Sequence, residues 1–166
     1  MIEALNITVT GIVQGVGFRP FVYRIAKEHQ LTGWVLNAVD GVSIHVEGMT
    51  ENIDRFTIAL SSQHPVAAKV AEIDLEEAPV EGFEDFSIRF SDDSAAEKTT
   101  LVSPDLATCD ECVKELFDPA DRRYRYPFIN CTNCGPRFTI IKELPYDRPH
   151  TSMASFAMCE SCQHEY

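Results

Sequence analysis

At 166 residues the chain is long enough for one mid-sized domain or two small ones. Hydrophobic residues make up 45% of it and charged residues 24%, close to globular averages, which excludes a wholly disordered chain. The net charge of −12 argues against binding to a nucleic-acid backbone, because such proteins carry a surplus of lysine and arginine.

The N-terminus and the cysteines indicate the compartment. The opening MIEALNITVT lacks the basic start and apolar core of a signal peptide, and no later apolar run approaches the roughly 20 residues of a spanning helix. We therefore expect a cytoplasmic protein that does not enter a membrane. All six cysteines occur in CxxC pairs between positions 109 and 162, which in a reducing compartment favours metal binding over disulfides.

The first strand and helix are predicted from their apolar periods. Residues 5–11 alternate apolar and polar side chains, which predicts a half-buried strand. After a glycine-rich loop, Pro20 suits a first helical turn, and the apolar residues that follow recur at helical spacing. Those residues are Phe21, Val22, Ile25 and Ala26.

Two more strands and a second helix follow. Residues 34–37 and 42–47 have extended character and are joined at the Asp-Gly pair 40–41, a hairpin turn signal. Thr50 is a suitable N-cap for a helix that we expect to end before Pro65. The buried stripe of this helix is predicted to be Ile53, Phe56 and Leu60.

Alternation returns in residues 70–76 and 86–90, which predicts two final strands. Their apolar positions are Ala71, Ile73 and Leu75, and then Phe86, Ile88 and Phe90. The order strand, helix, strand, strand, helix, strand predicts an α+β, ferredoxin-like βαββαβ domain, with one sheet covered on one face by two helices. We expect this domain to span residues 1–91.

The remainder of the chain has a different character. The run SDDSAAEKTT, which begins at position 91, is polar and aperiodic, and we expect a linker over residues 92–104. Beyond it the sequence is dense in Cys, Pro and Arg, as is typical where metal rather than a large apolar core supplies the folding energy. Residues 105–166 are therefore predicted to be a zinc-finger-type segment.

The loop before the first helix reads GIVQGVGFR and has the composition of an anion site. Glycines let backbone N–H groups converge, and a helix N-terminus adds partial positive charge. Arg19 would complete the site with a planar charged fork. The alternative is that Gly15 and Gly17 only permit a tight turn while Arg19 lies on the surface. For Asn37, the sequence alone favours a turn-capping amide beside residues 40–41.

The run GxVQGVGFR, followed eighteen positions after the arginine by Asn37 in GWVLN, resembles the signature of the acylphosphatase family. The resemblance implies that Arg19 binds a phosphoryl group together with the backbone amides of residues 14–18, and that Asn37 orients the attacking water. The phosphate-binding residues that it implies are Gln14, Gly15, Val16, Gly17, Phe18 and Arg19. An acyl phosphate leaves as a weakly basic carboxylate or carbamate, so positioning and charge stabilisation suffice without a metal or covalent nucleophile.

Two CxxC pairs, Cys109 with Cys112 and Cys131 with Cys134, are separated by eighteen residues, a spacing typical of a four-cysteine zinc site. Four thiolates leave no open position on the metal, so we expect a structural zinc. The alternatives are unligated buried thiols or a redox-active pair, for which a single CxxC would suffice.

A third pair, Cys159 and Cys162, has no fourth pair to match it, so only half of a second zinc site is present. Either His164 and a further group complete the site, or cysteines beyond Tyr166 in a longer parent protein do so. We favour the longer parent protein. His150 is a weaker ligand candidate.

Arginines and tyrosines alternate in the run DRRYRYPFIN, which precedes the second pair. Such a mixture can stack on nucleic acid, and this makes a nucleic-acid-binding finger a third hypothesis. The acidic overall charge instead favours arginines that pair with nearby carboxylates. The histidines of the first half have no spacing partners and are expected on the surface. They are His29, His45 and His64.

The whole pattern, with RRYRYPFINCTNCGPRFTI around the second pair, resembles the N-terminal part of the HypF family of hydrogenase maturation carbamoyltransferases. The resemblance implies a part in making the cyanide ligands of nickel-iron hydrogenases. In that family carbamoyl phosphate is cleaved, the carbamate is adenylated with ATP in a later YrdC-like domain, and the carbamoyl group passes to a cysteine of the partner HypE. This sequence lacks the later domains, so we expect at most the first hydrolysis.

The leading hypothesis is thus a hydrolase of acyl phosphates, physiologically carbamoyl phosphate, that acts through Arg19 and Asn37 and carries one structural zinc. The alternative is a zinc-braced binding or docking module without turnover of its own. The expected partners are the acyl phosphate, the missing C-terminal domains and, through the full-length protein, a HypE-type protein.

Overall fold

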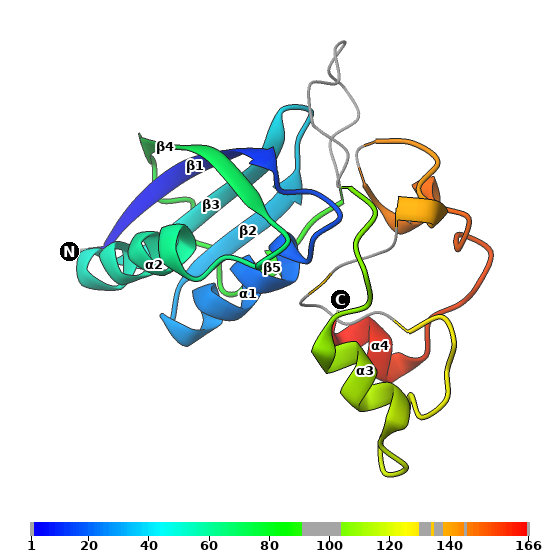
Figure 1. Ribbon diagram of the computed structural model, residues 1–166. Helices are drawn as coiled ribbons and strands as arrows, with labels where there is room; N and C mark the ends of the chain where they lie inside the picture. The colour runs from blue at the N-terminus through cyan, green and yellow to red at the C-terminus, as the bar shows by residue number, and fades with distance from the viewer. Residues whose placement is uncertain (1, 91–103, 130–133, 135–137, 145, 166) are drawn as a thin grey trace.

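The computed structural model describes residues 2–90, 104–129, 134, 138–144 and 146–165, except for the side chains of residues 162, 164 and 165. A sheet with two helices forms the first half, and a cysteine-bearing region with short helices forms the second (Figure 1). Most of the predicted linker, residues 92–103, lies outside the described residues.

The sheet domain has the predicted βαββαβ order followed by one further short strand, β5, which confirms the ferredoxin-like fold. The elements are β1 (Ile2–Ile12), α1 (Phe18–Glu28), β2 (Thr32–Asn37), β3 (Gly41–Met49), α2 (Thr50–Ser62), β4 (Lys69–Ala78) and β5 (Phe86–Ile88). The strands lie in the order β4-β1-β3-β2-β5. Neighbouring strands are antiparallel except β2 and β5, which are parallel.

The core lies between the sheet and the two helices, which cover one face of it (Figure 1). Ile7 and Val9 of β1 are buried there, as their alternation predicts. Both predicted helical stripes are buried as well, so the 3.6-residue period located each helix correctly. The buried stripe residues are Phe21, Val22, Ile25 and Ala26 in α1 and Ile53, Phe56 and Leu60 in α2.

Three local predictions differ from the structure. Thr50 is the first residue of α2 rather than its N-cap, a position that Met49 takes without a side-chain hydrogen bond. Leu75 is 48% exposed, because β4 is an edge strand that has a neighbour on one side only. Phe90 is 84% exposed, because β5 ends at Ile88.

His45 is buried rather than on the surface, because the segment between β4 and β5 folds over its face of the sheet. Its ring stacks on Trp34 at 6.0 Å between centroids and lies edge-on to Phe83 at 5.4 Å. Its nitrogens contact Asn6 Oδ1 at 2.7 Å and Glu47 Oε1 at 3.1 Å. His45 and Glu47 of the central strand β3 are therefore buried polar side chains that both have hydrogen-bond partners.

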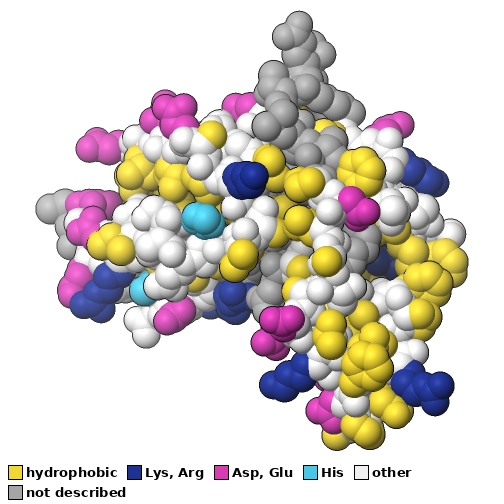
Figure 2. All heavy atoms as spheres, in the orientation of Figure 1, with side chains coloured by type: hydrophobic (Ala, Val, Ile, Leu, Met, Phe, Trp, Pro, Cys, Tyr) yellow, Lys and Arg dark blue, Asp and Glu magenta, His cyan; other side chains and the backbone are white. Residues whose placement is uncertain are grey.

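The cysteine-bearing region is built differently. Its elements are α3 (Asp110–Phe117), η1 (Phe138–Ile140), η2 (Arg148–His150) and α4 (Glu160–Glu165). Hydrophobic side chains gather on its surface, and Phe117 and Phe128 are each 71% exposed (Figure 2). The small apolar cluster that is described there centres on Cys112, Ile129 and Cys134, as expected where metal supplies the folding energy. None of the described helices has the length and apolar character to cross a membrane.

Candidate active site and metal centre

The loop between β1 and α1 is anchored in the core and leads into the N-terminus of the helix. Val16 and Phe18 are buried, whereas Gly15 and Arg19 are partly accessible. Gly15 and Gly17 have φ angles of 70° and 74°, in the left-handed region that favours glycine. The first turn of α1 therefore carries both Arg19 and backbone amides without partners within the helix, the groups that an anion site requires.

Gln14 fixes this loop against the turn between β2 and β3. Its side chain is 2% exposed, and Nε2 donates to Ala38 O and Gly41 O, both at 2.7 Å. The resemblance assigned only the backbone amide of Gln14 to the site. The role of its side chain was missed, because its partners lie 24 and 27 positions away and no local pattern marks them.

Asn37 ends β2 and is only 1% exposed. Its Nδ2 donates to the backbone oxygen of Tyr146 at 2.8 Å, while the turn beside it is closed by the backbone bond from Ala38 N to Gly41 O. The turn-capping alternative is therefore wrong. Among the buried side-chain atoms that the structure describes, Asn37 Oδ1 has no hydrogen-bond partner. A buried carbonyl oxygen in this condition is well suited to accept a hydrogen bond from a bound water or ligand.

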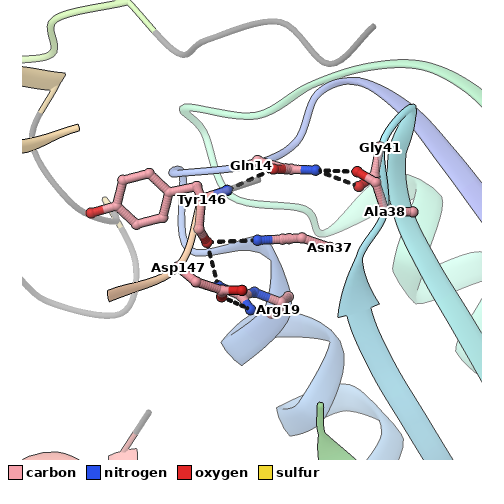
Figure 3. A network of polar contacts seen from close by, with 7 residues as sticks. All are labelled: Gln14, Arg19, Asn37, Ala38, Gly41, Tyr146 and Asp147. Carbon is pink, nitrogen blue, oxygen red and sulfur yellow. Dashed lines mark hydrogen bonds and ion pairs between the residues drawn. The ribbon is translucent and has the colours of Figure 1, made fainter. Parts of the chain in front are cut away.

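Arg19 does not lie on the surface, so that alternative is wrong as well; its side chain is 11% exposed. Nη1 donates to Asp147 Oδ1 at 2.6 Å, and Nη2 donates to the Tyr146 backbone oxygen at 2.8 Å. Figure 3 shows Arg19, Asn37 and Gln14 converging on these two residues. The sequence predicted the side chains of Arg19 and Asn37 as part of the site but gave no sign that residues 146–147 join them.

Three cysteines of the first two CxxC pairs meet in the second region. The sulfurs of Cys109, Cys112 and Cys134 lie within 4.8 Å of one another, and the last two are 3.7 Å apart. Tetrahedral zinc with Zn–S bonds of about 2.3 Å places its sulfurs roughly 3.8 Å apart, so the cluster fits zinc binding. Cys109 precedes α3 and Cys112 lies in its first turn, where the helix dipole stabilises thiolates. Cys131 lies outside the described residues.

Cys159 of the third pair does not belong to this cluster. Cys159 is exposed, and its sulfur accepts a hydrogen bond from Arg122 Nη1 at 3.8 Å. The side chains of Cys162 and His164 lie outside the described part of the chain. Arg123 pairs with Glu115 at 3.0 Å, which confirms for this arginine the prediction of pairing with a nearby carboxylate.

Two family models match the chain, Acylphosphatase over residues 5–88 and HypF finger over residues 108–141. Carbamoyltransferase HypF of Synechocystis sp. is 49% identical over 156 residues, which make up 94% of this chain and 20% of that protein. The acylphosphatase of Thermotoga petrophila is 46% identical over 89 residues, 53% of this chain and 98% of that protein. A crystal structure of full-length HypF in the phosphate- and nucleotide-bound form matches with a TM-score of 0.90 at 48% identity, covering 100% of this chain and 22% of that one.

The similarity covers different shares of the two kinds of relative. The chain spans about a fifth of the length of the HypF proteins that it matches, but its sheet domain covers nearly the whole of a separate acylphosphatase. The family models, the fold and the cysteine cluster therefore agree. The chain belongs to the acylphosphatase family over residues 5–88 and continues into a HypF-type finger over residues 108–141.

Proposed function

We propose that this chain hydrolyses acyl phosphates, physiologically carbamoyl phosphate, at the site formed by Arg19, Asn37 and the loop amides of residues 14–18. The observation that carries the proposal is the buried, unpartnered Oδ1 of Asn37 beside the charged fork of Arg19 and a helix N-terminus. One part of this site supplies positive charge for a phosphoryl group. The other supplies a fixed acceptor for a water hydrogen.

In the proposed reaction, Arg19 and the loop amides hold the phosphoryl oxygens, and Asn37 Oδ1 accepts a hydrogen bond from the attacking water. A P–O bond forms to the water oxygen as the P–O bond to the acyl group breaks, and the leaving carboxylate or carbamate keeps the electron pair. The water protons pass to phosphate and solvent. Because the leaving group is weakly basic, positioning and charge stabilisation carry the catalysis.

The role in the longer parent protein is part of the same proposal. Hydrolysis of carbamoyl phosphate would be the first step of carbamoyl transfer in nickel-iron hydrogenase maturation, with later domains using the carbamate and a HypE-type partner receiving the product. The overall similarity to HypF proteins over nearly the whole chain supports this role. The domain boundaries at residues 91 and 105 and the cytoplasmic location stay predictions.

Zinc would have a structural role. Cys109, Cys112 and Cys134 would hold the ion together with Cys131, and four thiolates would leave no position for substrate. A second site that uses Cys159 stays a prediction that needs ligands from outside the described residues.

The alternative function is a binding or docking module without turnover. It is favoured by one observation: the donors of Arg19 and Asn37 are already bonded to Tyr146 and Asp147. Such a site could hold residues 146–147 as a structural contact between the two halves of the chain.

Phosphate release separates the two functions. The zinc-loaded chain would be assayed with carbamoyl phosphate and a simple acyl phosphate, alongside Asn37→Ala and Arg19→Ala. The matched controls are Asn52→Ala in α2 and Arg24→Ala, an exposed arginine of α1.

We expect Asn37→Ala to lower kcat by roughly 100-fold, as the loss of one positioned polar group does in other enzymes, while the controls stay active. Arg19→Ala should abolish the binding of inorganic phosphate. A folded wild-type chain that binds phosphate but releases none from either substrate would establish the binding module instead.

A further inference from the structure

Residues 146–147 belong to a loop that is closed at its base and enters the anion site. The inserted loop, residues 140–144 and 146–152 as described, is joined by the bridge between Ile141 and Thr151. Lys142 N donates to His150 O at 2.9 Å, and Ser152 N donates to Ile140 O at 2.8 Å. The tip of the loop is thus presented as a unit to the site in the sheet domain.

The tip uses the same donors that a phosphoryl group would use. Asp147 offers a carboxylate oxygen to one nitrogen of Arg19, and the Tyr146 carbonyl accepts from the other and from Asn37 Nδ2 (Figure 3). Tyr146 N donates to Gln14 Oε1 at 3.1 Å. Two oxygens on a guanidinium fork, one of them charged, reproduce the bidentate contact between arginine and phosphate.

A phosphate cannot take both nitrogens of Arg19 while this contact is present. Asp147 also carries a negative charge, which would repel an anion next to it. We propose that the tip of the inserted loop is an intramolecular competitor for the anion site, which acyl phosphate displaces and which Asp147 returns to the site afterwards. Asp147 thereby sets the affinity and selectivity of the site, since a phosphoryl dianion has more charge than the carboxylate that it replaces.

Two observations favour a displaceable contact over a permanent structural lock. The tip satisfies Arg19 and Asn37 Nδ2 but leaves Asn37 Oδ1 without a partner, so it fills the site incompletely. In addition, Lys142 and Glu143 near the tip are exposed, and the buried residues of the inserted loop are Tyr146, Asp147 and Thr151 among those described. Tyr146 is the one buried apolar side chain among the described residues of the loop, so the tip is held mainly by its contacts in the site.

The test compares the full zinc-loaded chain with Asp147→Asn, which keeps the shape of the side chain and removes its charge. Glu143→Gln is the matched control, because it removes one charge from an exposed position of the same loop. The dissociation constant of inorganic phosphate would be measured by titration calorimetry at fixed ionic strength, together with KM for a simple acyl phosphate.

If the tip competes, the observed affinity equals the intrinsic affinity multiplied by the open fraction, so Asp147→Asn should bind phosphate roughly tenfold more tightly and show a lower KM. Glu143→Gln should match the wild type. Unchanged or weaker phosphate binding by a folded Asp147→Asn variant would overturn the proposal and make Asp147 a structural or substrate-binding group.

A second measurement needs no variant. Saturating phosphate should release the Tyr146 N–H from Gln14 and speed its hydrogen exchange, whereas chloride at the same ionic strength should not. Slower or unchanged exchange in the presence of bound phosphate would contradict displacement.

The proposal rests on the proposed function only in taking acyl phosphate as the natural ligand, and the two fail separately. Tighter phosphate binding by Asp147→Asn without any turnover would support the competing loop tip and contradict the proposed hydrolase activity. Normal turnover with no gain in phosphate affinity in Asp147→Asn would support the hydrolase activity and contradict the competing loop tip.

Discussion

Glu47 provides the sharpest test of how the sheet domain is held together. Its side chain is 4% exposed, and its carboxylate accepts hydrogen bonds from the backbone N–H groups of Glu81 at 2.5 Å, Gly82 at 3.0 Å and Phe83 at 3.1 Å. Burial raises the pKa of Glu47, but the hydrogen bonds from His45 and from the three amides together outweigh it, and the pKa lies below its ordinary value of 4.5. The substitution Glu47→Gln keeps one oxygen, replaces the other with an NH₂ group and removes the charge.

The expected loss follows from these contacts. At least one loop N–H would face the new NH₂ group, and the others would change from a charged to a neutral acceptor, so we expect the free energy of unfolding to fall by roughly 2–4 kcal/mol at pH 7. For a domain of fewer than 100 residues this lowers Tm by on the order of 10–25 °C.

The effect should depend on pH in one direction. Because the pKa of Glu47 is lower in the folded than in the unfolded protein, the unfolded state binds the proton first as pH falls. The stabilisation is complete above the unfolded pKa near 4.5 and is lost as pH falls through the folded pKa. The gap in Tm between wild type and Glu47→Gln should therefore narrow below pH 4.5.

Thermal unfolding followed by circular dichroism at pH 7 and below pH 4.5 measures this gap. Glu77→Gln, an exposed position of the edge strand β4, is the control for loss of one acidic charge. Equal Tm values for the two variants at pH 7, or a gap that widens in acid, would refute the reasoning.

Two further predictions concern the site and the metal. Gln14→Ala removes three hydrogen bonds that join the loop to the β2–β3 turn and to Tyr146, so the free energy of unfolding should fall by about 3 kcal/mol in denaturant titration, whereas Gln63→Ala at an exposed position should change it little. A zinc chelator should open residues 104–165 to proteolysis and leave the sheet domain resistant, because the core of that domain contains no cysteine. Loss of the sheet domain along with the finger, or a finger that stays protected, would contradict this expectation.

The sheet domain was predictable because its signals are local. The stripes of α1 and α2 follow from a period within one helix, and the 40–41 turn follows from two adjacent residues. Where a prediction failed, the deciding factor was a neighbour or its absence. Leu75 is exposed because β4 is at the sheet edge, and His45 is buried because residues 81–83 fold over it.

The sequence alone determined the βαββαβ order, the glycine loop with Arg19 at the start of a helix, and three of the cysteines that cluster. Helical and strand periods and turn residues are local patterns, and metal ligands occur at characteristic spacings, so the sequence alone shows them. Only the tertiary structure brought Tyr146 and Asp147 to the site, across 109 positions from Asn37 and 128 from Arg19. Hydrogen bonds between residues so far apart in the sequence depend on how the folded sheet domain and the cysteine-bearing region pack together, and no local sequence pattern identifies their partners.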